Sequence, residues 1–179
     1  MHIVVTLKQV YDPNTPPALL QVGEDGKSVS VRSGMSPVLN GYDANAIEEA
    51  IRIKEKVGGT ITAISVGDEQ GINHIRRAIA MGGDAGVHVQ GPTGLNCDSV
   101  AIATLIAAAI KKLGPVDLVI CGKASSDTDA GQTHLILAEM LGISAVSPIK
   151  AVREIDAESI VVDRMGEDAI QRIKARFPL

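Results

Sequence analysis

The chain has 179 residues, which suits a single domain with a sizeable hydrophobic core. A net charge of −4 and 2% aromatic residues exclude a basic, base-stacking surface, so we expect no nucleic-acid partner. The most apolar stretch, residues 98–113, is too short to cross a bilayer, so we expect no membrane insertion. The sequence begins with a predicted strand and shows no pattern of a secretory signal peptide. Cys97 and Cys121 are isolated in the sequence, so we expect both to be buried thiols. Together these features indicate a cytoplasmic protein without a metal site.

The first half of the chain shows strand and helix patterns separated by glycine. In chain order, a strand, a hairpin, a helix and a second strand are predicted over residues 3–7, 19–33, 45–57 and 60–66. Within the predicted helix, Glu48 is one turn before Arg52 and can pair with it. Gly58 follows as a natural residue to end this helix.

The second half repeats the same alternation. The predicted elements are a helix, a strand, a helix, a strand and a helix over residues 69–81, 86–90, 98–113, 116–121 and 134–141. Asp98 is the expected N-cap of the middle helix, and Gly114 with Pro115 ends it. Alternating elements of these lengths predict an α/β fold, with a doubly wound, mostly parallel sheet and antiparallel hairpin additions in one domain over residues 1–179.

The last 35 residues depart from this alternation and resemble an antiparallel excursion. Strands are predicted over residues 159–164 and 169–177, the second with Arg172, Lys174 and Arg176 on one face. That basic row fits either a solvated sheet face or docking to an acidic partner. The ending Phe177-Pro178-Leu179 resembles the approach to another buried strand, so we expect the chain to be truncated relative to its natural domain.

The most informative segment is the loop that follows the strand 116–121. It is rich in Gly, Ser, Thr and Asp and leads into a helix, an arrangement that favours phosphate binding by backbone N–H groups. A capped surface turn would have the same composition. Asp127 and Asp129 would repel phosphate unless they cap backbone N–H groups or reach a ribose, and their spacing alone does not predict a metal pair.

Several segments, taken in order, resemble the β subunit of electron transfer flavoprotein. Each matches a family motif, and together they extend over nearly the whole chain: Ile3–Val10, Leu39–Asp43, Ile47–Glu55, Arg77–Asp84 and Gly122–Thr133. The resemblance implies an adenine nucleotide α-hydrolase-like fold and a subunit that works in a heterodimer with an α subunit. It also implies an electron carrier subunit that is not an enzyme in its own right.

The cofactors and partners expected from this resemblance are AMP, FAD, the α subunit and flavin dehydrogenases. FAD would be held mainly by the α subunit, and this chain would bury AMP and help to enclose the flavin. The cofactor-binding positions implied by the motifs are Thr6, Asn40, Gly41, Tyr42, Asp43, Val66, Gly122, Lys123, Ala124, Ser125, Ser126, Asp127, Thr128, Asp129, Ala130, Gly131, Gln132 and Thr133. Among them, the backbone N–H groups of Ser125, Thr128 and Gly131 are the expected phosphate donors, together with Gln132 and the Thr133 hydroxyl.

Departures from the family pattern leave alternatives open. Gly41 replaces a usual Pro, and His134 replaces a usual Gly and is read here as a surface or capping residue. Thr133 favours AMP over the second FAD of electron-bifurcating members. Tyr42 is either a neighbour of the flavin or an ordinary turn residue. The family's C-terminal strand and partner-docking arm have no counterpart here.

Two other function classes compete with this interpretation. A stand-alone AMP- or ATP-binding regulatory module of the universal-stress type would share the fold without a flavin. An ATP-cleaving enzyme would need a Ser/Gly-rich loop after the first strand, which residues 8–13 do not supply.

Overall fold

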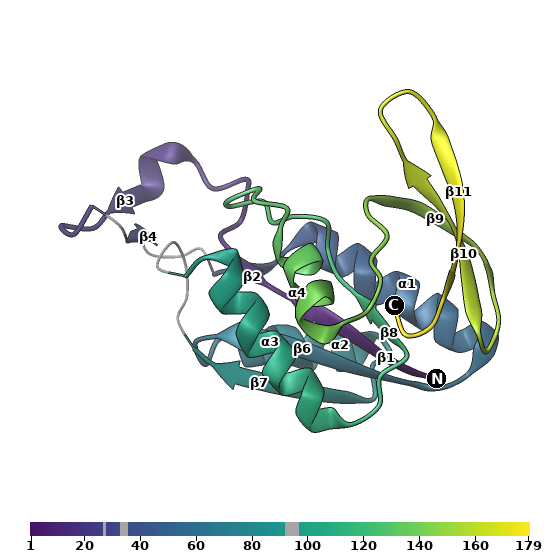
Figure 1. The fold of residues 1–179 in the computed structure, drawn as a ribbon. Helices are drawn as coiled ribbons and strands as arrows, with labels where there is room; N and C mark the ends of the chain where they lie inside the picture. The colour runs from purple at the N-terminus through teal and green to yellow at the C-terminus, as the bar shows by residue number, and fades with distance from the viewer. Residues whose placement is uncertain (27, 33–35, 92–96) are drawn as a thin grey trace.

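The centre of the molecule is a four-stranded parallel sheet (Figure 1). The computed structural model describes residues 1–26, 28–32, 36–91 and 97–179. The strands follow the order β7-β6-β1-β8, with the bounds β7 (Ala85–Gln90), β6 (Thr60–Gly67), β1 (His2–Leu7) and β8 (Leu118–Ile120). All pairings are parallel, which confirms the predicted fold class. The last strand is shorter than the predicted 116–121.

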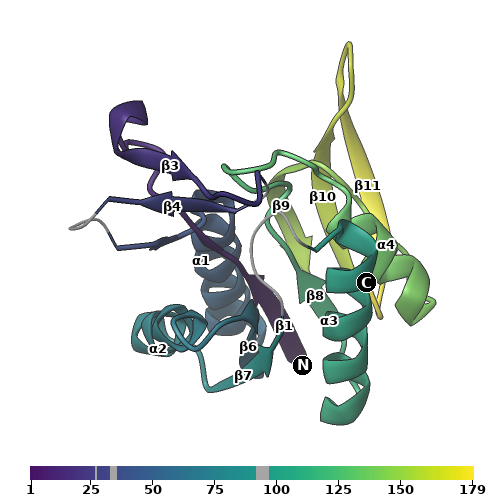
Figure 2. The same ribbon diagram turned by 90° about the vertical axis from the view of Figure 1, so that its left-hand side faces the viewer.

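Two pairs of helices cover the sheet (Figure 2). One pair, α1 (Gly41–Val57) and α2 (Gly71–Met81), packs on the face lined by Ile3 and Ile61. The other pair packs on the opposite face, and its members are α3 (Ser99–Leu113) and α4 (Thr133–Leu141).

The sequence signals for the helix ends are only partly confirmed. The Asp98 side chain accepts a hydrogen bond of 2.8 Å from Ala101 N as the predicted N-cap. Gly58, at a φ of 75°, ends α1, and Arg52 and Glu48 pair at 3.4 Å. The predicted start of α1 was wrong by four residues, because the helix begins at Gly41 and not at residue 45.

A change in winding direction favours a ligand site beside β1. The chain runs from β1 outward to β6 and β7, and then returns to place β8 on the other side of β1. The connections on the two sides cover opposite faces, so they diverge above the ends of β1 and β8. Open α/β sheets bind ligands at such a switch point, outside the carboxyl ends of the strands.

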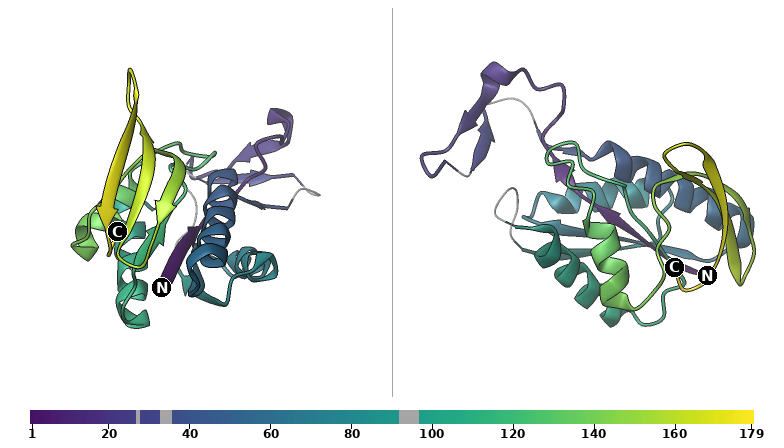
Figure 3. Two further views of the ribbon diagram at one scale, coloured as in Figure 1. Left: turned by 90° about the vertical axis from the view of Figure 1, so that its right-hand side faces the viewer. Right: turned by 45° about the horizontal axis from the view of Figure 1, so that its top comes forward.

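A second, antiparallel sheet packs beside α1 (Figure 3). Its order is β11-β10-β9, with bounds β9 (Ile149–Ile155), β10 (Ser159–Met165) and β11 (Ile170–Arg176). Only the last two strands were predicted. β9 was missed because its partly exposed sequence includes Lys150, Arg153 and Glu154, which blur a clear alternation of apolar and polar residues.

The basic row on β11 includes a paired arginine. Asp163 on β10 is 2% exposed, and its two carboxylate oxygens accept Nε–H of Arg153 at 2.6 Å and Nε–H of Arg172 at 2.9 Å. These hydrogen bonds, first from Arg172 and then from Arg153, hold the pKa of Asp163 below its ordinary value. The two arginines therefore join three strands through one carboxylate.

Replacing Asp163 with Asn is expected to lower the melting temperature near neutral pH, because two guanidinium groups then lose their shared charge partner. Because the pKa of Asp163 is lowered by folding, its carboxylate stabilises the fold fully at pH values above the unfolded pKa of 3.8. This stabilisation is lost as the pH falls through the folded pKa. The difference from the parent chain should therefore shrink in acid. Circular dichroism melts over a pH series measure this, with Asp168→Asn in the exposed turn 166–169 as the control. Equal melting temperatures at neutral pH would contradict the pairing.

Short elements complete the fold. The predicted hairpin is confirmed as β3 (Leu20–Val22) paired with β4 (Val29–Val31), although its residues 27 and 33 lie outside the described ranges. It follows the 3-10 helix η1 (Pro17–Leu19) and extends away from the parallel sheet (Figure 1). The small antiparallel pair β2 (Gln9–Val10) and β5 (Val38–Leu39) was not predicted.

The end of the chain lies against the edge of the parallel sheet. Leu179 is 8% exposed, donates to Asp117 O at 3.1 Å and accepts from Val119 N at 2.8 Å. This is the bonding pattern of a parallel bridge beside β8.

The two cysteines differ from expectation, because Cys97 and Cys121 are only partly buried.

Candidate functional site

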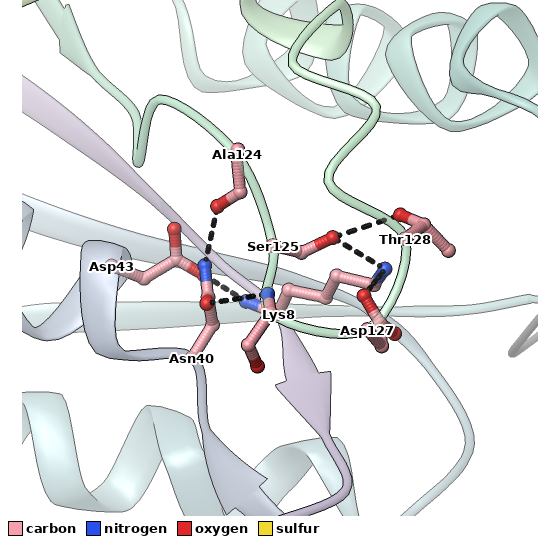
Figure 4. Close-up of polar contacts among 8 residues, drawn as sticks. Lys8, Asn40, Asp43, Ala124, Ser125, Asp127 and Thr128 are labelled. Atoms are coloured by element: carbon pink, nitrogen blue, oxygen red, sulfur yellow. Dashed lines mark hydrogen bonds and ion pairs between the residues drawn. The ribbon is translucent and has the colours of Figure 1, made fainter. Parts of the chain in front are cut away.

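The predicted site residues gather where β1 and β8 end. Loop 122–132 leaves β8 and crosses toward the start of α1, which follows β5 (Figure 4). Hydrogen bonds join this loop to three residues outside it: Lys8, Asn40 and Asp43. We call these three residues and loop 122–132 the switch-point site.

Asn40 holds the loop with a side chain that would ordinarily cap a helix. It occupies the N-cap position of α1, where Asn usually accepts a backbone N–H of its own helix. Its amide Nδ2 instead donates to Ala124 O at 2.8 Å, and its Oδ1 accepts the N–H of Ser126 at 3.4 Å. With an exposed fraction of 1%, this side chain is committed to shaping the loop.

Asp43 joins the same segments from inside the protein. Its carboxylate accepts the backbone N–H of Lys8 at 2.7 Å and a backbone hydrogen bond from Gly122. Burial raises the pKa of Asp43 from 3.8 to about 7, and the hydrogen bonds from Lys8, Asn40 and Gly122 oppose that rise only in part. The site therefore contains a carboxyl group that changes charge near neutral pH.

Lys8 reaches across from the end of β1 into the loop. Its ammonium donates to Asp127 Oδ1 at 2.7 Å and to Ser125 Oγ at 3.0 Å (Figure 4). Ser125 Oγ also lies 3.0 Å from Thr128 Oγ1, so one ammonium organises three loop side chains. Burial alone would raise the pKa of Asp127, but hydrogen bonds from Lys8 and Ser125 outweigh it and lower that pKa.

The backbone of the loop is tightly turned. Asp129 adopts a φ of 47°, its N–H donates to Ser125 O at 2.8 Å, and Gly131 follows at a φ of 61°. Within the described part of the chain, the N–H groups of Ser125, Thr128 and Gly131 donate to no protein acceptor. These are the three N–H groups that the sequence predicted as phosphate donors.

The remaining predicted residues surround this centre. Thr6 lies on the α3 side of β1 and shares a hydrogen bond with Cys121, whose pKa burial raises to about 11. Val66 packs among the residues of the α3 face and is not joined to the loop by a hydrogen bond. Tyr42 is 37% exposed, and the Lys123 ammonium lies 5.1 Å from its ring centroid, within the range of a cation–π contact.

Four predicted residues occupy less constrained positions. They are the exposed Gly41 and Ala130, Gln132 at the N-cap of α4, and Thr133 as its first residue. Gln132 makes no side-chain capping bond there, so its amide is available to a ligand.

The other side of the loop borders a cavity of about 730 Å³ between α4 and the antiparallel sheet. Four predicted site residues line it: Lys123, Ala124, Asp129 and Gly131. His134 lines it too, but its Nε2 lies 2.8 Å from Ser147 Oγ, and burial lowers its pKa. We therefore assign His134 a structural role at this cavity, and Thr6 and Val66 lie outside it.

Sequence reasoning missed the part played by the Lys8 side chain. Its position in the opening family motif was visible, but its two side-chain partners lie 117 and 119 residues away along the chain. The composition of the loop did indicate a missing cation, because Asp127 needs a positively charged partner if the loop is to bind an anion.

Comparisons with known proteins identify the family of the chain. The family described as Electron transfer flavoprotein domain matches residues 28–178. The chain belongs to the electron transfer flavoprotein β subunit family.

The relatives are similar over the whole chain. It is 36% identical over 179 residues to the electron transfer flavoprotein subunit beta of Thermoanaerobacterium thermosaccharolyticum, covering 100% of this chain and 66% of that protein. It is 33% identical to the subunit beta of Bacillus subtilis (100% and 67% covered) and 29% identical to Protein FixA of Azotobacter vinelandii (99% and 63% covered). The chain thus spans about two thirds of the length of these relatives.

The described ranges lack two kinds of feature. No helix in them has both the length and the apolar character to cross a membrane. They also contain no group of three His, Cys, Asp or Glu side chains that could hold a metal ion.

Proposed function

We propose that this chain binds AMP at the switch-point site and acts as the β subunit of an electron transfer flavoprotein. It would help to enclose an FAD held mainly by an α subunit and relay electrons from flavin dehydrogenases to an acceptor. Membership of the family supports this proposal, as do relatives named as electron transfer flavoprotein subunits.

One observation carries the nucleotide-binding part of the proposal. Lys8, Asn40 and Asp43 brace a tightly turned loop whose N–H groups at Ser125, Thr128 and Gly131 have no acceptor in the described protein. Preorganised, unpaired N–H groups near a helix N-terminus suit a phosphate group. The residues present therefore fit the phosphate group of AMP.

Electron transfer itself would depend on the flavin, whose ring system carries the electrons. This chain would contribute orientation and electrostatics. Tyr42 is suited to contact a planar ring because it is partly exposed at the start of α1, beside the loop. The Lys123 ammonium over its face would have to move for a ring to stack there.

The test is isothermal titration of the purified chain with AMP and ATP, together with co-expression with an electron transfer flavoprotein α subunit. We expect AMP binding and a yellow, FAD-containing complex. A colourless homodimer that binds ATP would contradict the proposal and support a stand-alone regulatory module. Mass spectrometry of the nucleotide released by heating the complex distinguishes AMP from a second FAD in this subunit.

A further inference from the structure

The charge of loop 122–132 conflicts with binding a phosphate. The loop carries one cation, Lys123, and two carboxylates, Asp127 and Asp129. The phosphate of AMP is a dianion for the most part at neutral pH. A loop with a formal charge of −1 would repel it, so a compensating charge must come from outside the loop.

Lys123 is poorly placed to compensate the loop. Its ammonium lies over the Tyr42 ring, 5.1 Å from the centroid. It forms no ion pair with either loop carboxylate within the described residues. Another cation must therefore cancel the repulsion between Asp127 and a bound phosphate.

Hydrogen bonds hold both the main chain and the ammonium of Lys8 beside loop 122–132. Its backbone N–H donates to Asp43 at 2.7 Å, and its carbonyl accepts the N–H of Asn40 at 3.0 Å. Its ammonium meets Asp127 at 2.7 Å and Ser125 Oγ at 3.0 Å. Two buried residues therefore fix the main chain of Lys8, and the contacts with Asp127 and Ser125 hold its 40% exposed side chain at the loop.

We propose that Lys8 is a positioning residue that neutralises Asp127 and so allows loop 122–132 to accept a phosphate monoester dianion. The inference rests on the proposed AMP binding and specifies what controls it. Loop 122–132 and Lys8 together have a formal charge of zero. Its unpaired N–H groups then attract the phosphate without opposition from Asp127.

The experiment compares AMP with adenosine, which lacks the phosphate, by isothermal titration. Lys8→Met should weaken AMP binding about tenfold or more, because an unpaired carboxylate then faces the phosphate. Adenosine binding should stay within about twofold, since the base and ribose do not meet that charge. Lys8→Arg should retain most of the AMP affinity. The double variant Lys8→Met with Asp127→Asn should recover most of it, because the repulsive charge is gone.

Lys54→Met is the matched control. Lys54 forms a comparable pair with Asp84, at 2.6 Å, near the opposite ends of the strands. Its loss should lower the melting temperature and leave AMP affinity unchanged.

Each outcome decides the matter. If the parent chain binds no AMP, the proposed function fails and this inference fails with it. If the parent binds AMP but Lys8→Met does so equally well, only the role of Lys8 is overturned. It is likewise overturned if Lys8→Met weakens AMP and adenosine equally, or if Asp127→Asn fails to restore AMP binding, because both results mark a purely structural contact.

Discussion

Replacing Gly122 with Ala is expected to lower the free energy of unfolding by about 1 to 3 kcal/mol, and to weaken AMP binding as well. An added Cβ would collide with the Asp43 carboxylate and lie 2.9 Å from the Tyr42 Cβ. Asp43 cannot move aside cheaply, because it is 5% exposed and hydrogen-bonded to Lys8. Urea unfolding measures the first effect, and titration with AMP measures the second.

Gly41→Ala is the matched control for this prediction. Gly41 lies just before Tyr42, and an added Cβ would meet nothing within 4 Å. It is the first residue of α1, where Ala should be neutral or slightly stabilising. If the two alanine variants unfold at the same urea concentration, the close approach of Gly122 to Asp43 is wrong.

The free energy of unfolding of the parent chain is expected to fall as the pH rises, because Asp43 ionises. Replacing Asp43 with Asn should abolish this fall. Burial raises the pKa of Asp43 from 3.8 in the unfolded chain to about 7 in the folded one. A raised carboxyl pKa means that the folded state binds the proton more tightly. Its stability contribution is therefore full below 3.8 and is lost as the pH rises toward 7. The loss is on the order of 4 kcal/mol, at ~1.4 kcal/mol for each unit of pKa between the two values.

The measurement is urea unfolding of both chains at about pH 4.5 and about pH 7.5. The Asp43→Asn variant would leave one hydrogen bond unmade at every pH, so it should carry a constant penalty of about 1 to 3 kcal/mol. The difference in free energy of unfolding between the two chains should therefore be smaller at pH 7.5 than at pH 4.5. Asp84, Asp127, Asp156 and Asp163 have lowered pKa values and act at lower pH, so they do not produce this change. A difference independent of pH would contradict the raised pKa.

The same titration bears on ligand binding. Deprotonation of Asp43 near pH 7 strengthens its hold on the backbone N–H groups of Lys8 and Gly122, since hydrogen bonds to a charged acceptor are the stronger ones. The hydrogen bonds that brace the loop therefore strengthen over the pH range in which the fold loses stability.

The layered fold was predictable because it depends on local periodicity. Strand 3–7 and helix 98–113 have apolar spacing that specifies their type, and glycine marks where helices such as α1 and α4 end. The strand β9 escaped prediction because its partly exposed apolar residues alternate irregularly with charged ones. Its pairing with β10 contains register shifts that a sequence pattern does not show.

The candidate site was predictable in its place but not in its hydrogen bonding. Strands that run parallel bring their ends to one edge, so the end of β1 and loop 122–132 had to be neighbours once the winding was known. The use of the Asn40 amide on Ala124 O, 84 residues away, was not predictable from sequence spacing. An N-cap asparagine ordinarily serves its own helix, and only packing diverted it.

By itself, the sequence determined the doubly wound architecture, the loop rich in Gly, Ser, Thr and Asp, and the position of that loop at the edge of the sheet. These follow from local spacing, from turn residues and from the rule that parallel strands end together. The tertiary structure alone decided the charge state of the site. Burial sets the pKa of Asp43, and the Lys8–Asp127 pair joins residues 119 apart, because desolvation and long-range ion pairs arise only when distant segments pack together.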